Sequence, residues 1–240
     1  MLVLAIDTCH PRGSVCITQN SATFPVISHD PDEESSSWLL PAIQKALVAE
    51  GASFGDLSAI AVASGPGSFT GVRVGLTTVK ALCEVYSIPA VPVSRLLAVA
   101  HLSSRRAGWI ASFVDARRGE VFGAAYLVVE GRLENPSLEL AAPVTEFQSE
   151  VLRVAGGETV LWASPDEPLL ADVRANPNRA GSGDLFEQVG PLLAPAIAEI
   201  GLQRLKLGQT ADPISLDANY IRRPDAERLW KGLKSAGHAR

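Results

Sequence analysis

Short apolar runs alternate with amphipathic stretches over the first hundred residues of the chain. Residues 2–6 form a near-continuous apolar run, and residues 14–18 regain β-branched character after a turn-rich segment, which predicts a β-hairpin. Residues 57–63 and 90–93 are further strand candidates because each is short, apolar and bounded by turn signals.

Three helices are predicted among these strands. One covers residues 35–50 and contains Pro41, which lies either in its first turn or at a kink. A second covers residues 70–86, and Ser94 is expected to cap a third that runs through His101. Alternation of strands and helices predicts an α/β fold.

A second strand–turn–strand pattern occupies residues 108–129. Aligning Asp7 with Asp115 superposes the two predicted hairpins, each with an aspartate at the end of its first strand. The similarity is either a chance match of two hairpins or a true repeat. A repeat predicts two subdomains of similar topology, with a boundary near residue 105.

The rest of the chain gives fewer signals. Residues 131–180 are rich in Pro, Gly, Ala and Asn, and only a strand near residues 159–163 is predicted there. Residues 184–207 look helical, with interruptions at Pro191 and Pro195.

The expected organisation is a first subdomain over residues 1–105 and a second over residues 106–190. A C-terminal helix over about residues 192–223 is expected to pack back on the first subdomain. The polar end, residues 231–240, is expected to be frayed.

Composition excludes several classes of protein. The 240 residues are 47% hydrophobic and carry 21 Lys+Arg against 26 Asp+Glu, unlike a disordered chain or a protein that binds nucleic acid by bulk charge. No apolar run approaches the roughly 18 residues of a membrane span, and no signal peptide is recognised. Cys9, Cys16 and Cys83 form no CxxC pair, which favours reduced core thiols in a cytoplasmic protein.

The densest motif is GPGSFTGVRVG at residues 65–75. A glycine-rich loop between a strand and a helix can make a tight turn, bind phosphate with its N–H groups, or contact a partner. It is not a Walker A loop, because no Gly-Lys-Ser/Thr follows.

The predicted helices carry more apolar surface than one sheet needs. Residues 70–86 present one apolar face and one face of small residues, and residues 35–50 are similar. Both helices are either buried within one domain or form a helical interface with another chain. The residues assigned to such an interface are Trp38, Leu39, Leu40, Ile43, Gly71, Val72, Gly75, Leu76 and Val79.

Candidate catalytic chemistry is sparse. Asp7 and Asp115 end strands before turns, where they either cap the turns or hold a metal–phosphate group between subdomains. Thr8, Gly67 and Ser68 complete this possible nucleotide or phosphate site. The four histidines have no metal-ligand spacing, so no metal site is predicted.

Taken together, these motifs resemble the TsaB (YeaZ) family, whose members take part in making threonylcarbamoyladenosine on tRNA. The glycine motif resembles the signature of the family. Supporting similarities lie at Leu4-Ala5-Ile6-Asp7-Thr8, Leu39-Leu40-Pro41, Ile88-Pro89, Val93-Ser94, Val114-Asp115-Ala116-Arg117, Glu120-Val121 and Asn219-Tyr220-Ile221-Arg222.

The resemblance implies an ASKHA (actin-like) fold built from two RNase H-like subdomains. It implies a non-catalytic, cytoplasmic scaffold of the complex that adds the threonylcarbamoyl group to N6 of adenosine 37 of tRNA. The implied partners are a TsaD-type catalytic subunit, a TsaE-type ATPase, a second copy when alone, and tRNA through the complex. No cofactor is implied, with ATP bound only weakly or within the complex.

One departure from the family pattern lies before Leu39. The family commonly has His-Ser-Glu there, whereas this chain has Ser35-Ser36-Ser37, so no role of that histidine carries over and Trp38 is a new contact. The alternative function is an actin-like ATPase or small-molecule kinase that uses Asp7 and Asp115. A metalloprotease is disfavoured, because the ligand pattern is missing.

Overall fold

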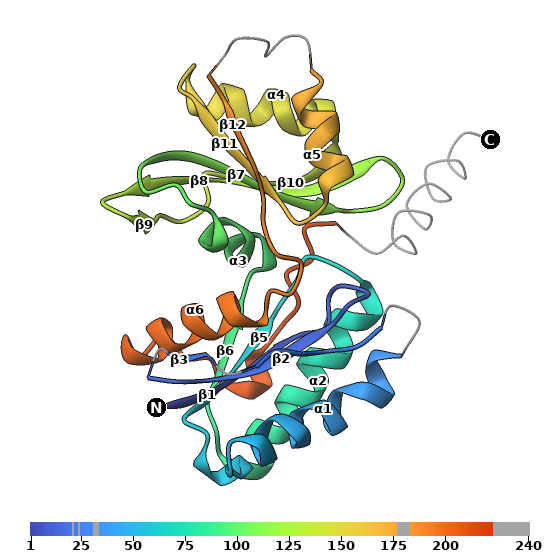
Figure 1. Ribbon diagram of the computed structural model, residues 1–240, viewed down its shortest axis with the longest axis vertical. Helices are drawn as coiled ribbons and strands as arrows, with labels where there is room; N and C mark the ends of the chain where they lie inside the picture. Colours follow the sequence, from blue (N-terminus) through green and yellow to red (C-terminus); the bar gives the residue numbers. More distant parts are fainter. Residues whose placement is uncertain (21, 24, 31–33, 177–182, 223–240) are drawn as a thin grey trace, which may run out of the picture.

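The structure is a computed structural model that describes the chain except residues 21, 24, 31–33, 177–182 and 223–240. Two β-sheets are stacked along the long axis of the molecule, with helices outside and between them (Figure 1). The segment predicted to be frayed, residues 231–240, lies outside the described residues.

The first sheet contains the predicted N-terminal hairpin. Its strand order is β3-β2-β1-β5-β6, with β4 also paired to β2. Strand β1 is antiparallel to β2 and parallel to β5, which is parallel to β6. Every residue of β5 is buried, because helices cover both faces of this sheet. The strands are β1 (Leu2–Asp7), β2 (Ser14–Gln19), β3 (Ala22–Thr23), β4 (Ile27–Ser28), β5 (Ala59–Ala63) and β6 (Ala90–Val93).

The second sheet repeats this arrangement. Its order is β10-β8-β7-β11-β12, and β7 is antiparallel to β8 but parallel to β11. Asp115 ends β7 as Asp7 ends β1, so the two predicted hairpins do correspond in three dimensions. The strands are β7 (Gly108–Asp115), β8 (Glu120–Val129), β9 (Arg132–Leu133), β10 (Leu138–Pro143), β11 (Val160–Ser164) and β12 (Leu185–Gln188).

Helices form the remaining layers. Helices α1 and α2 lie together on the outer face of the first sheet, and α4 and α5 cover the outer face of the second (Figure 1). Between the sheets, α6 packs on the first sheet and α3 packs on both the second sheet and α6. The helices are α1 (Ser35–Ala49), α2 (Phe69–Tyr86), α3 (Arg95–Leu102), α4 (Val144–Ala155), α5 (Glu167–Arg174) and α6 (Ala194–Lys206).

Alternate residues of β7 face different cores. Ile110 and Val114 join the cluster between the sheets, whereas Ala111 and Phe113 pack with Phe147 beneath α4. This period of two is what a strand with both faces covered requires.

Several sequence predictions need correction in the second half of the chain. Residues 185–188 form strand β12 rather than helix, because they pair in parallel with β11. Pro195 lies in the first turn of α6, where its missing N–H has no helical acceptor, and the helix ends at Lys206 rather than near residue 223. Strand β10, α4 and α5 occupy a stretch in which the sequence predicted only β11.

Two predictions about helix starts have different outcomes. Pro41 lies well inside α1 and not in its first turn. The predicted cap at Ser94 is confirmed, because its side chain accepts the Leu97 N–H at 3.5 Å.

Candidate binding cleft

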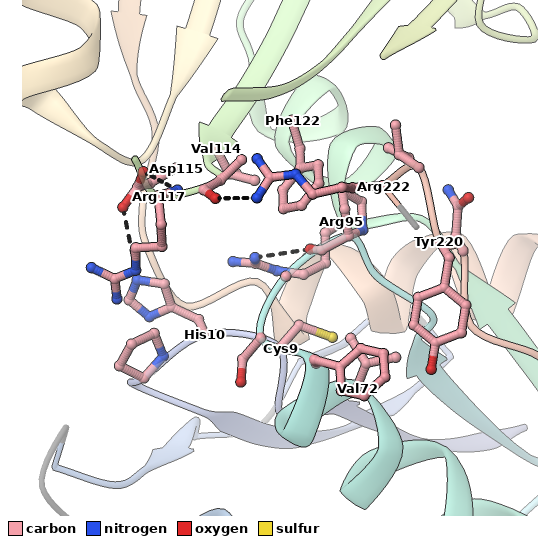
Figure 2. Close-up of a pocket in the computed structure, with 18 of the residues that line it drawn as sticks. Cys9, His10, Val72, Arg95, Val114, Asp115, Arg117, Phe122, Tyr220 and Arg222 are labelled. Atoms are coloured by element: carbon pink, nitrogen blue, oxygen red, sulfur yellow. Dashed lines mark hydrogen bonds and ion pairs between the residues drawn. The ribbon is translucent and has the colours of Figure 1, made fainter. Parts of the chain in front are cut away.

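A cleft of about 740 Å³ opens between the two sheets (Figure 2). Its walls come from the turn after β1, the loop before α2, the start of α3, the turn after β7 and the segment 219–222. The carboxyl ends of β1, β5 and β7 meet there, and this is the edge at which α/β sheets usually bind ligands.

The glycine motif builds the floor of the cleft by close backbone packing. Gly65 has φ 104°, a conformation that favours glycine. The Ser68 N–H donates to the Cys9 carbonyl at 2.8 Å, and a methyl group on Gly67 would overlap with Cys9. The motif therefore serves the tight turn and helix packing that were one of its three interpretations.

Asp7 is held in a buried ion pair. Its carboxylate accepts from Arg95 Nε at 3.2 Å and from the Cys9 N–H at 2.8 Å, and both charged side chains are almost fully buried. Asp7 does not line the cleft. The oxygens that a metal–phosphate group would need are thus engaged by the chain itself.

Thr8 also faces away from the cleft. Its hydroxyl donates to the Gly71 carbonyl at 2.6 Å, and a methyl group on Gly71 would overlap with the Thr8 carbonyl. A methyl group on Gly75 would meet the Thr8 hydroxyl. The backbone that approaches the small face of α2 is therefore the end of β1 in the same chain, which corrects the expectation that this face is free for a partner.

Asp115 lies at the mouth of the cleft. Its carboxylate accepts from the Arg117 N–H at 2.7 Å, and Arg117 Nε lies 3.5 Å from its other oxygen. Its own N–H donates to Asp166 at 3.1 Å. Of the five residues predicted for a phosphate site, the cleft brings together Gly67, Ser68 and Asp115.

The pKa values of His10 and Cys9 are both shifted from their ordinary values. Burial, followed by the nearby Arg95 charge, lowers the pKa of His10. The His10 Nδ1 accepts the Arg12 N–H at 3.0 Å, so the neutral ring carries its proton on Nε2. Burial and the Asp7 charge raise the pKa of the Cys9 thiol, which is free and buried like Cys16 and Cys83.

The segment 217–222 ties the two sheets together, a role that the sequence did not reveal. The Asn219 N–H donates to the Ser64 carbonyl at 2.7 Å, and its side chain donates to Glu139 at 3.0 Å. Arg222 donates to the Ala116 carbonyl at 3.1 Å and to Glu120. The only signal for this segment was the resemblance of Asn219-Tyr220-Ile221-Arg222 to a family motif.

Most residues predicted for a partner interface pack inside the chain. Leu40 is exposed, and the Trp38 ring lies against His29 with centroids 4.7 Å apart. The buried residues of that set are Trp38, Leu39, Ile43, Gly71, Val72, Gly75, Leu76 and Val79.

Other apolar side chains of α1 and α2 do reach the surface. Val48 is 77% exposed and Val85 is 73% exposed, and Leu40 and Tyr86 are also exposed. Tyr86 stacks on Phe54, which follows α1, so the ends of the two helices lie close together. These four side chains, Leu40, Val48, Val85 and Tyr86, are called the α1–α2 surface below.

The described residues contain neither a membrane-spanning helix nor a cluster of metal-ligating side chains. Across the residues with a described placement, no helix has the length and apolar character needed to cross a bilayer. No group of three or more His, Cys, Asp or Glu side chains in that same part of the chain is arranged to hold a metal ion.

Comparisons with known proteins identify relatives over nearly the whole chain. The family model described as TsaD, tRNA N6-adenosine threonylcarbamoyltransferase, matches residues 26–150. The "tRNA threonylcarbamoyladenosine biosynthesis protein TsaB" of Escherichia coli is 29% identical over 97% of this chain and 98% of its own length.

Solved structures show the same fold. YeaZ from Pseudomonas aeruginosa superposes with a TM-score of 0.71 at 21% identity, covering 91% of this chain and 99% of that one. The ROK hexokinase from Thermus thermophilus has a TM-score of 0.51 at 11% identity, covering 87% and 100%. The predicted actin-like (ASKHA) fold with two halves of similar topology is confirmed.

Proposed function

Because the chain belongs to the threonylcarbamoyltransferase family, and within it to the TsaB (YeaZ) group, we propose that it acts in threonylcarbamoyladenosine synthesis on tRNA. Its role is that of a non-catalytic, cytoplasmic scaffold that pairs with and activates a TsaD-type catalytic subunit. It has no cofactor of its own, and ATP binds only weakly or within the complex.

The observation that carries this proposal is the α1–α2 surface. The two helices form the outermost layer on the first sheet (Figure 1), and four large apolar side chains on them remain exposed. Leu40 and Val48 lie two turns apart on one face of α1, which suits the packing of another helix. Burying about 800 Å² of such a surface on each partner is enough for a stable complex.

The same surface serves two alternative assemblies. The TsaD-type subunit occupies it in the complex, and a second copy of this chain occupies it when the chain is alone. The TsaE-type ATPase joins the pair, and tRNA is reached through the complex.

The ion pair of Asp7 with Arg95 favours a scaffold over the alternative, an actin-like ATPase or small-molecule kinase. That chemistry needs carboxylates free to position a metal ion and phosphates. The Asp7 carboxylate is held by Arg95 and the Cys9 N–H, and Asp115 is held by Arg117.

Charged substitutions on the α1–α2 surface test the scaffold. Leu40→Glu and Val48→Glu are expected to weaken binding to the TsaD-type subunit of the same organism by about a hundredfold, because each buries a carboxylate against apolar surface. Co-purification with light scattering measures the complex, and circular dichroism checks the fold. Leu185→Glu, at a residue 57% exposed on β12, is the matched control and should bind normally.

Two results would contradict the proposal. One is full-strength assembly by both Leu40→Glu and Val48→Glu. The other is micromolar ATP affinity in the isolated chain that Asp7→Ala abolishes, which would favour the ATPase. This substitution needs a stability check, because Asp7 is buried in an ion pair.

A further inference from the structure

Arg95 has one unused hydrogen-bonding group in the wall of the cleft. Its Nε donates to Asp7, and its Nη1 donates to the Pro66 carbonyl at 3.2 Å. Its Nη2 is buried and has no hydrogen-bond partner among the described residues. Figure 2 shows this guanidinium group inside the cleft, between Cys9 and the Val114–Asp115 end of β7. A buried donor of a charged group is costly to leave unpaired.

The start of α2 adds positive potential at the same place. Phe69, the first residue of this 18-residue helix, and its N-cap Ser68 line the cleft beside Pro66. The first N–H groups of a helix lack helical acceptors and form the positive end of its dipole. The Ser68 side chain caps the Gly71 N–H and the Ser68 N–H donates to Cys9, so the N–H groups of Phe69 and Thr70 are left for other acceptors.

The two acidic side chains of the cleft already accept hydrogen bonds from other groups of the chain. Asp115 is held by Arg117, and Asp166 accepts the Asp115 N–H. His10, at the cleft wall beside Arg117, offers a further donor at Nε2 (Figure 2). The donors that remain available in the cleft are therefore cationic or neutral N–H groups.

One part of the cleft wall is apolar, whereas Asn219, Tyr220 and Arg222 are further polar residues of the lining. Val72, Val114 and Phe122 line it, and its volume of about 740 Å³ exceeds what a single phosphate or carboxylate group needs.

From this combination we propose that the cleft binds a small anionic molecule, whose carboxylate or phosphate-ester head accepts from Arg95 Nη2 and whose apolar body contacts Val72, Val114 and Phe122. Asp7 does not contact the ligand, because it is paired with Arg95 and does not line the cleft. The proposal is independent of the scaffold function, since the cleft and the α1–α2 surface lie on different parts of the molecule.

Binding of phenyl phosphate, benzoate and neutral phenol to the full chain tests the proposal without any substitution. Each probe is titrated while the Arg95 side-chain N–H signals are followed by NMR. Phenyl phosphate or benzoate is expected to bind at least about tenfold more tightly than phenol, because only the anions accept charge-assisted hydrogen bonds. Tighter binding by one of the two anions identifies the head group.

The imidazole of His10 gives a second readout in the same titration. The charged groups that act on its pKa are Arg95, Asp7 and Asp166, and Arg117 lies beside it (Figure 2). An anion bound between Arg95 and His10 offsets the Arg95 charge and raises the pKa of His10. A ligand bound elsewhere on the surface would leave this pKa unchanged.

Substitution then locates the head group. Arg95→Lys keeps the charge beside Asp7 but removes the Nη2 donor, so the preference for anions over phenol should fall by about tenfold. Arg153→Lys, on the exposed face of α4, is the matched control and should keep it. If Arg95→Lys fails to fold, the same three probes are titrated into His10→Gln, which lacks the imidazole Nε2 donor. Its preference for anions over phenol is then compared with that of the wild type. Equal affinity for all three probes, or shifts confined to residues outside the cleft, would overturn the proposal.

Discussion

Replacing Arg95 by methionine is expected to lower the free energy of unfolding by about 3–5 kcal/mol. The substitution leaves the Asp7 carboxylate, which is 1% exposed, without its cationic partner. The Cys9 N–H alone then stabilises the buried charge. Urea denaturation followed by circular dichroism measures the loss as a shift of the midpoint.

The double variant Asp7→Asn, Arg95→Met distinguishes the cost of an unpaired buried carboxylate from the cost of losing the Arg95 side chain. Removing both charges together abolishes the unpaired carboxylate, and the introduced amide oxygen can still accept the Cys9 N–H, so most of the lost stability should return. A single variant Arg95→Met as stable as the wild type would show that Arg95 is not needed to neutralise Asp7.

The ion pair also explains why the phosphate site suggested by the sequence of the first half lacks a free carboxylate at Asp7. Asp7 sits at the end of β1, where the sequence predicted a possible phosphate site. Its partner Arg95 lies 88 residues away, at the start of α3. No local pattern connects the two residues, so only the fold reveals that the carboxylate is occupied.

The parts of the fold that the sequence predicted well depend on local signals. The hairpin of β1 and β2 follows from apolar and β-branched runs that flank a turn, and α3 begins at a serine cap. The fold of the second half is harder to predict from the sequence. Strand β12, for example, is only four residues long and owes its conformation to pairing with β11.

Helix α4 was missed although it carries a readable pattern. Phe147, Val151 and Ala155 recur every four residues and are buried together on the second sheet. The Pro, Gly and Asn residues around this segment obscured the helical period. The four-residue spacing of these buried side chains is the signal that indicates a helix within this loop-like composition.

The largest effect of a glycine substitution is expected at Gly71. Gly71→Ala should lower the free energy of unfolding by about 3 kcal/mol, even though alanine favours a helix more than glycine does by about 1 kcal/mol. The added methyl group meets the backbone carbonyl of Thr8 at the end of β1, so no side-chain rotation can relieve the overlap. Thr8 also donates to the Gly71 carbonyl, and this bond would stretch as α2 moved away.

Comparison with two other glycines makes this prediction specific. Gly190→Ala is the matched control, because nothing lies within 4 Å of the new methyl group and the free energy of unfolding should change by less than about 0.5 kcal/mol. Gly75→Ala should fall between the two, since the closest atom it meets is the Thr8 hydroxyl, which can rotate. If Gly71→Ala is as stable as Gly190→Ala, then α2 does not rest on the end of β1.

The same contacts decide how the α1–α2 surface can be tested. A charged residue at Gly75 would push against Thr8 and disturb the start of α2 before it met any partner. Loss of a complex in Gly75→Glu would therefore report damage to the fold. Loss in Leu40→Glu or Val48→Glu, with the stability of the isolated chain unchanged, reports the interface itself, because both side chains already face solvent.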